Sequence, residues 1–130
     1  MGLTVGTGQT MNVSGLSSNQ NTIHAGAGGL ITINGNFTNL AAGIIAIDIG
    51  GTSTSQFGRI NITGSATLAG TLQVSYVNGF LPSLSQRFSI LTFASRTGTF
   101  GTILGNDAGN GIRLDTDYQT TKLDLVGVAS

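Results

Sequence analysis

The chain offers few side chains that could carry out chemistry. His24 is its single histidine, and its 130 residues include no cysteine and no glutamate. One histidine excludes a histidine-rich metal site, and the lack of thiols excludes a disulfide framework and a thiolate metal centre. His24 lies between turn residues, so we predict a solvated residue at a strand end without a catalytic role.

The aspartates are the other candidates. Asp107 lies in a glycine-rich turn that has oxygen ligands for calcium but lacks the closing glutamate of an EF-hand. Asp115 and Asp117 are two positions apart and would share one face of a strand, an arrangement that is compatible with the paired carboxylates of a glycosidase. No aromatic sugar platform accompanies them. We therefore predict that the protein is not an enzyme and has no cofactor, with a weak structural calcium site as the alternative.

The elements that carry these residues are predicted to be short strands. Apolar residues alternate with polar ones throughout, and no window of helical length shows a glycine-free helical pattern. The clearest alternations are Ile45/Ile47/Ile49, Ile60/Ile62, Leu68/Leu72/Val74/Tyr76, Phe88/Ile90, Leu91/Phe93, Ile112/Leu114 and Leu123/Leu125. Four dipeptides that tolerate positive φ separate the strands, namely Asn34-Gly35, Gly50-Gly51, Asn78-Gly79 and Asn110-Gly111. The phenylalanines concentrated late in the chain are predicted to fill a core.

Composition narrows the class of partner. Only 8% of residues are charged, and five basic residues are scattered among five aspartates for a net charge of zero. No basic stripe exists to neutralise phosphates, so we predict no nucleic-acid partner. No stretch approaches the roughly 20 apolar residues of a membrane helix, so we predict no membrane insertion by this chain. The N-terminal stretch also lacks a signal-peptide pattern. A nearly neutral surface favours association.

A weak internal repeat suggests stacked coils. An Asn-apolar-Ser/Thr unit occurs as Asn12-Val13-Ser14, Asn36-Phe37-Thr38 and Asn61-Ile62-Thr63, and the two intervals between the copies are nearly equal. Repeats of about 20 to 50 residues are typical of solenoids, in which each rung covers the apolar face of its neighbour.

Longer runs resemble a known class of surface proteins. They comprise Ile45 to Thr52, Phe57 to Val74, Asn78-Gly79-Phe80, Phe88 to Thr92, Gly98-Thr99-Phe100 and Leu123-Asp124-Leu125. In this order they resemble the closing, C-terminal passenger segment of bacterial autotransporters and related adhesin-like proteins with β-strand repeats. The resemblance covers roughly residues 44 to 128. It implies a solenoid that ends in a strand cap, and it implies no catalytic motif.

These observations predict one all-β domain over residues 1–130. Solenoid-like rungs are expected over residues 1–78 and an antiparallel strand cap over residues 79–130, with a two-sheet β-sandwich or jelly roll as the alternative.

The predicted function is structural. We expect a segment or subunit of a bacterial extracellular fibre or cell-surface adhesin that assembles by strand pairing or end-to-end stacking with copies of itself or neighbouring β-strand repeats. The alternative is a carbohydrate- or ligand-binding β-module of a secreted protein. Neither charge nor proline protects the chain before Asp48, so an N-terminal strand is free to pair with another subunit. The predicted assembly residues are Leu3, Val5, Met11 and Val13.

Overall fold

The computed structural model describes residues 3–130, which form strands and no helix. Met1 and Gly2, the first residues of the N-terminal stretch that lacks a signal-peptide pattern, lie outside the described residues. The strands are β1 (Leu3–Val5), β2 (Thr10–Ser14), β3 (Ser18–Asn19), β4 (Thr22–Ala25), β5 (Leu30–Asn34), β6 (Phe37–Asn39), β7 (Ile44–Ile49), β8 (Arg59–Ile62), β9 (Ser65–Leu68), β10 (Thr71–Tyr76), β11 (Arg87–Thr92), β12 (Ser95–Gly98), β13 (Thr102–Leu104), β14 (Ile112–Tyr118) and β15 (Lys122–Ala129). The all-β prediction is confirmed.

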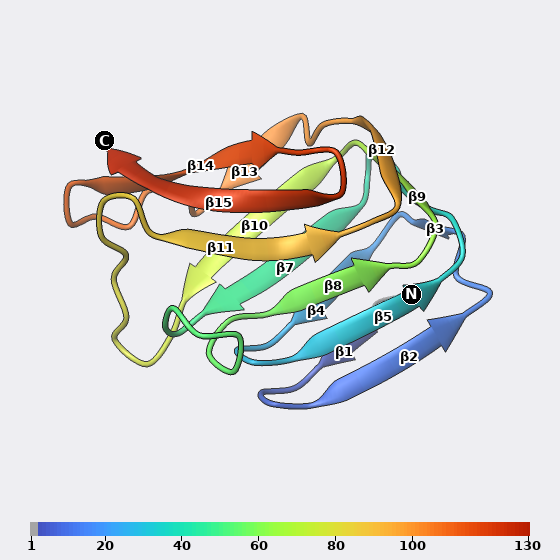
Figure 1. Cartoon of the computed structure of the whole chain (residues 1–130), viewed down its shortest axis with the longest axis horizontal. Coiled ribbons are helices and arrows are strands. Elements are labelled where there is room, and N and C mark those ends of the chain that lie inside the picture. The colour runs from blue at the N-terminus through green and yellow to red at the C-terminus, as the bar shows by residue number, and fades with distance from the viewer. Residues whose placement is uncertain (1–2) are drawn as a thin grey trace.

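The strands belong to three sheets. Sheet A has the order β1-β4-β7-β10-β13, sheet B the order β2-β5-β8-β11-β15-β14, and sheet C the order β3-β6-β9-β12. The chain thus visits the sheets in turn, and three successive strands, one from each sheet, make what we call a circuit. In Figure 1, β2, β5, β8, β11 and β15 follow one another from the bottom to the top of the view, in front of the strands of sheet A.

Pairing between circuits is parallel and in register. In sheet A, Ile23 pairs with Ile45 and Ile45 with Leu72. All three side chains are at most 1% exposed, and they form an aliphatic column through the core. Leu3 and Ile103 continue this column at its two ends, where both are only partly buried. The alternation of large aliphatic residues therefore builds a core because successive circuits place them one above another.

The strands form three mainly parallel sheets, which differ from the predicted alternative of a two-sheet β-sandwich or jelly roll, and their register corrects the predicted repeat. In sheet B, Val13 pairs with Ile33 and Ile33 with Ile62, so the second interval along the chain is much longer than the first. Phe37, from the middle copy of the predicted repeat, lies in sheet C and pairs with Ala66. The predicted repeat was wrong because the circuits have unequal lengths, so equal intervals along the chain do not lead to equivalent positions in the sheets.

The antiparallel part begins later than residue 79. Strands β11, β12 and β13 still pair in parallel with β8, β9 and β10. Only β14 and β15 are antiparallel, paired with each other and, through β15, with β11. A register shift between Ser89 and Leu91 accompanies the burial of both Ile90 and Leu91, which explains the break in alternation there. The hairpin of β14 and β15 lies at the top of Figure 1.

The predicted turns are confirmed at the Asn-Gly dipeptides. Gly35, Gly79 and Gly111 have φ of 107°, 69° and 84°. Gly50 and Gly51 also separate two strands, β7 and β8, but their φ angles lie outside the positive region. A Cβ at Gly51 would lie 2.3 Å from Gln56 Oε1, so a larger residue here would displace the end of this exposed side chain.

The aromatic prediction is also confirmed. Phe88 is fully buried, and its ring meets Phe57 and Phe80 edge to face, with centroids 5.5 and 6.0 Å apart. Phe93 and Phe100 are buried as well. Residues 3–130 hold no helix with the length and apolarity that a bilayer crossing requires.

Candidate assembly interface

The first circuit leaves one end of all three sheets open. Strands β1, β2 and β3 are the terminal strands of sheets A, B and C, and within residues 3–130 none has a partner on its outer side. The three edges lie at the same level of the stack because each belongs to the first circuit. Unpaired edge strands carry free backbone donors and acceptors and pair readily with other chains.

The four predicted assembly residues lie in this circuit, but they are not equally accessible. Leu3, Met11 and Val13 are partly buried and pack against the core at its end. Val5 is 2% exposed, so it already belongs to the core of its own chain. The prediction that these residues serve contacts between subunits more than their own core is therefore wrong for Val5, and for the other three it stays a prediction.

An apolar hollow opens beside these strands. Its volume is about 340 Å³, and its lining includes Leu3, Val13, Leu16, Ile23, Leu40 and Asn19. Leu40 is 38% exposed, whereas Ile23 at the base of the hollow is 1% exposed. The hollow is the place where the next layer of the aliphatic columns would sit.

Two buried asparagines connect the first circuit to the second. Asn19 and Asn39 are paired in register in sheet C, and Asn19 Nδ2 donates to Asn39 Oδ1 at 2.9 Å. Asn39 Nδ2 donates in turn to the carbonyls of Gly43 (3.1 Å) and Ala69 (2.7 Å). Asn19 Nδ2 also donates to the carbonyls of Asn21 (3.0 Å) and Ile44 (3.3 Å), and Asn19 Oδ1 accepts the Asn21 backbone N–H at 3.1 Å. A carbonyl oxygen has room for a second donor.

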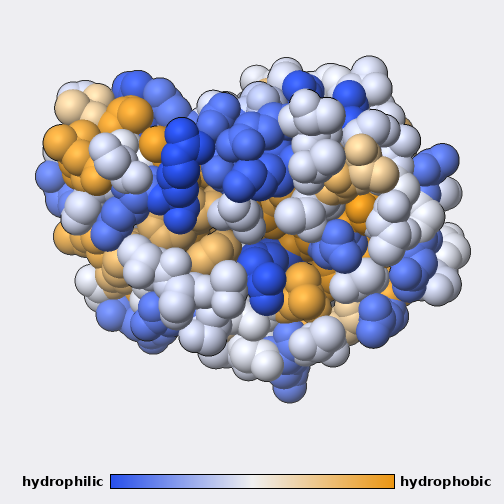
Figure 2. Space-filling model, in the orientation of Figure 1, coloured by the Kyte–Doolittle hydropathy of each residue, from blue (hydrophilic) through white to orange (hydrophobic). Residues whose placement is uncertain are grey.

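The opposite end differs in charge. Eight of the ten charged residues lie at position 87 or later, namely Arg87, Arg96, Asp107, Arg113, Asp115, Asp117, Lys122 and Asp124. The terminal strand of sheet B here is β14, which carries three of them. In Figure 2, strongly hydrophilic side chains gather in the upper half of the view, over the region of β11, β14 and β15. Charges along an edge strand discourage pairing with another chain.

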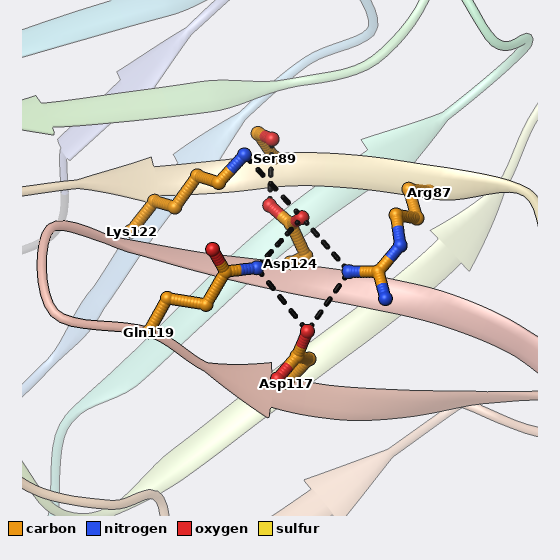
Figure 3. A network of polar contacts seen from close by, with 6 residues as sticks. All are labelled: Arg87, Ser89, Asp117, Gln119, Lys122 and Asp124. Carbon is orange, nitrogen blue, oxygen red and sulfur yellow. Dashed lines mark hydrogen bonds and ion pairs between the residues drawn. The ribbon is translucent and has the colours of Figure 1, made fainter.

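A polar network ties β11, β14 and β15 together around Asp124 (Figure 3). The Asp124 side chain is only 2% exposed. Ser89 Oγ donates to its Oδ1 at 2.6 Å, and Gln119 Nε2 donates to its Oδ2 at 3.2 Å. Arg87 Nη1 and Lys122 Nζ lie 3.3 and 3.6 Å from Oδ2. These partners replace the water that a buried carboxylate loses.

The two carboxylates considered for glycoside chemistry are held in ion pairs with arginines. Arg113 Nε donates to Asp115 at 2.7 Å, and Arg87 Nη1 donates to Asp117 at 2.8 Å. These hydrogen bonds hold the pKa of both carboxyls below the ordinary value. A raised pKa is the usual property of a general acid, so the pair is poorly suited to that role.

The remaining candidates have local partners. His24 Nε2 lies 2.9 Å from Asp48 Oδ2, across the β4–β7 pair. Asp107 accepts the backbone N–H of Gly109 in its turn at 3.0 Å. Within residues 3–130 no three acidic, histidine or cysteine side chains gather where they could hold a metal ion.

Sequence reasoning missed the asparagine pair and the leucines of the hollow. Asn19 and Asn39 stand one circuit apart, as the register shows, and Gly6/Gly26, Gly8/Gly28 and Gly15/Gly35 are identical pairs with the same separation along the chain. A search for identical polar residues at the separation of 20 positions that this pair has could have found them.

A scan against protein-family models and a search of curated proteins found no match to this sequence. The resemblance to autotransporter passenger segments stays a prediction.

Proposed function

We propose that the chain is a non-enzymatic structural segment or subunit of a bacterial extracellular fibre or surface adhesin. It assembles by strand pairing or end-to-end stacking with copies of itself or neighbouring β-strand repeats. The observation that carries the proposal is the asymmetry of the two ends. The first circuit presents three open edges without a charged residue, whereas the opposite end carries most of the charge. A chain selected to stay monomeric would protect both ends.

We further infer that the circuits are the rungs of a short β-solenoid. The support is that every third strand enters the same sheet and that parallel pairs repeat from the first circuit to β13. In such a stack each rung buries the apolar face of the next, so a terminal rung leaves apolar side chains uncovered. Leu3, Leu16 and Leu40 around the hollow have this property.

The non-enzymatic part of the proposal draws on the state of the ionisable groups. Asp115, Asp117 and Asp124 all have basic partners. Asp117 and Asp124 pair with Arg87 of β11, whereas Asp115 pairs with Arg113 within β14. Their ion pairs span neighbouring strands or nearby positions of one strand. The extracellular location rests on the resemblance to surface proteins.

A second candidate function is binding of a carbohydrate or another polar ligand. The observation in its favour is a hollow of about 340 Å³ on sheet B, whose polar lining includes Arg59, Asn61, Ser89 and Thr92. Thr92 Oγ1 donates to Asn61 Oδ1 at 2.8 Å, so part of this polar surface is already satisfied within the chain.

Electron microscopy of the purified chain, together with a glycan array, separates the two functions. The structural role predicts paired or longer end-to-end particles and no glycan binding. Single particles of one chain that bind a defined glycan, with R59A abolishing the binding, would replace the structural proposal with the ligand-binding one.

A further inference from the structure

The hollow on sheet B holds a cation, Arg59, that has no ion-pair partner within residues 3–130. We propose that this hollow, called here the sheet B hollow, binds a small polyhydroxylated carboxylate of the sugar-acid class, with Arg59 holding the carboxylate group. The site lies on the side of the stack and involves neither of its ends. The inference therefore goes beyond the proposed structural function and is compatible with end-to-end assembly.

The sheet B hollow lies where the ladder between β8 and β11 ends. These two strands pair in register only at Ile60 and Asn61 of β8. In β11 the register against β15 shifts between Ser89 and Leu91, and Arg59, the first residue of β8, has no paired residue on β11. Register shifts of this kind locally disrupt a ladder and re-aim side chains, often beside functional sites. The backbone thus opens the sheet next to the Arg59 side chain.

Arg59 differs from the other basic residues in its surroundings. Its Nε is buried and has no hydrogen-bond partner. A guanidinium that has lost water without gaining an acceptor carries an uncompensated charge, and a bound anion removes that deficit. The other four basic side chains are paired or stacked, namely Arg87 with Asp117 and Asp124, Lys122 with Asp124, Arg113 with Asp115, and Arg96 with the ring of Tyr118.

The neighbouring side chains supply further donors for an anion. Thr92 Oγ1 donates to Asn61 Oδ1 at 2.8 Å, so the two N–H groups of Asn61 Nδ2 are the part of this amide that can serve a ligand. Thr54 adds a hydroxyl from the exposed loop between β7 and β8. A carboxylate accepts several such bonds, and its strongest and most specific contacts are with arginine. The donor set therefore matches a carboxylate.

Two hydroxyl oxygens in the sheet B hollow favour a ligand that also carries hydroxyl groups. Ser89 Oγ donates to Asp124 Oδ1 at 2.6 Å, and the Thr92 hydroxyl donates to Asn61, so both hydroxyl protons are in use. Toward a ligand these two oxygens therefore act as acceptors, which the hydroxyls of a sugar acid satisfy and a bare sulfate ion does not. The Asp124 carboxylate itself is compensated by two basic partners.

The bound molecule connects neighbouring circuits. Strands β5, β8 and β11 belong to successive circuits and lie side by side at the front of Figure 1. The hollow measures about 340 Å³, near the lower end of the range for small-molecule pockets, so it suits one molecule of sugar size. A ligand held by β8 and β11 together binds only the folded stack and therefore raises its thermal stability.

The test is titration of the 130-residue chain with gluconate, followed by two-dimensional NMR and by thermal melting. Sorbitol is the matched neutral probe, since it has an alcohol in place of the carboxylate, and acetate is a carboxylate without hydroxyls. We expect saturable shifts and a higher Tm with gluconate, no response to sorbitol, and at least about tenfold weaker binding of acetate. The proposal is overturned by the absence of a saturable response to gluconate, or by sorbitol, acetate or sulfate binding as tightly as gluconate.

Variants place the binding in the sheet B hollow. R59Q should weaken gluconate binding by at least about tenfold, because it removes the charge-assisted hydrogen bonds. T54A should weaken it by about two- to tenfold, whereas T52A, the matched change in the same exposed loop, should leave it unchanged. Wild-type affinity in folded R59Q, or in T54A where R59Q does not fold, refutes the assignment. A chain that binds no gluconate but still forms end-to-end particles keeps the structural function, because the two sites are separate.

Discussion

Replacing Asn39 with alanine tests whether the circuits are held together by buried side-chain amides. Asn39 is fully buried and makes three side-chain hydrogen bonds, with Asn19, Gly43 and Ala69. At about 0.5–1.5 kcal/mol each, their loss should lower the free energy of unfolding by about 2–4 kcal/mol. The part-buried Ala69 carbonyl also loses the Asn39 donor, whereas the Gly43 carbonyl keeps the backbone N–H of Thr71. At a typical urea m value, the unfolding midpoint should fall by about 1–2 M.

The matched control is N12A. Asn12 lies in β2 with an exposed side chain, so its replacement should change stability by no more than about 0.5 kcal/mol. Urea unfolding is followed by far-UV circular dichroism at low protein concentration, because self-association would add to the apparent stability.

The double variant N19A/N39A completes a cycle in which we expect a coupling of about 0.5–3 kcal/mol. An N39A midpoint equal to that of N12A, or strict additivity in the cycle, would refute the reasoning, because the amide contact would then contribute nothing between circuits.

Three further predictions concern other parts of the chain. G111V should cost more than about 1 kcal/mol because valine is strained at φ of 84°, and thermal melting checks this; G105A should cost still more, since its Cβ would lie 2.0 Å from the Val74 carbonyl oxygen. Burial, with a contribution from Asp107, raises the pKa of Tyr76 to about 12. Its stabilising contribution is therefore complete below about pH 10 and is lost as the pH rises toward 12; alkaline unfolding with Y76F as control should show a smaller loss in the variant. The pKa values of Asp115 and Asp117 are lowered, so their ion pairs contribute above the ordinary carboxyl pKa and the contribution is lost as the pH falls through the lowered values. In D115N/D117N the acid-induced loss of stability should shrink, assembly should stay intact, and a loss of assembly measured by sedimentation would contradict the placement of the interface.

The strands and several turns could be predicted from the sequence because both are local properties. The alternation of Ile45, Ile47 and Ile49 reflects the period of two with which a strand turns side chains to opposite faces, and all three are buried. Asn78-Gly79 and Asn110-Gly111 indicate turns because their backbones tolerate positive φ. The sequence also shows that the N-terminal half carries little charge, and this predicts a strand edge that is not protected against pairing.

The pairing of the strands was decided only by the tertiary structure. Ile33 pairs with Val13 on one side and with Ile62 on the other, and these two partners lie at unequal distances from it along the chain. The local sequence does not show that the two separations differ, because the extra residues of the longer circuit form loops outside the sheets while the stacked side chains stay in register. The contacts between Asn19 and Asn39 and between Arg87 and Asp117 depend on this register. The sequence by itself therefore determined which residues face inward and where the chain turns. The packing of whole circuits decided which strand edges have no partner. The alternation of apolar and polar residues shows only which face of a strand is buried, and it does not identify the strand that pairs with it.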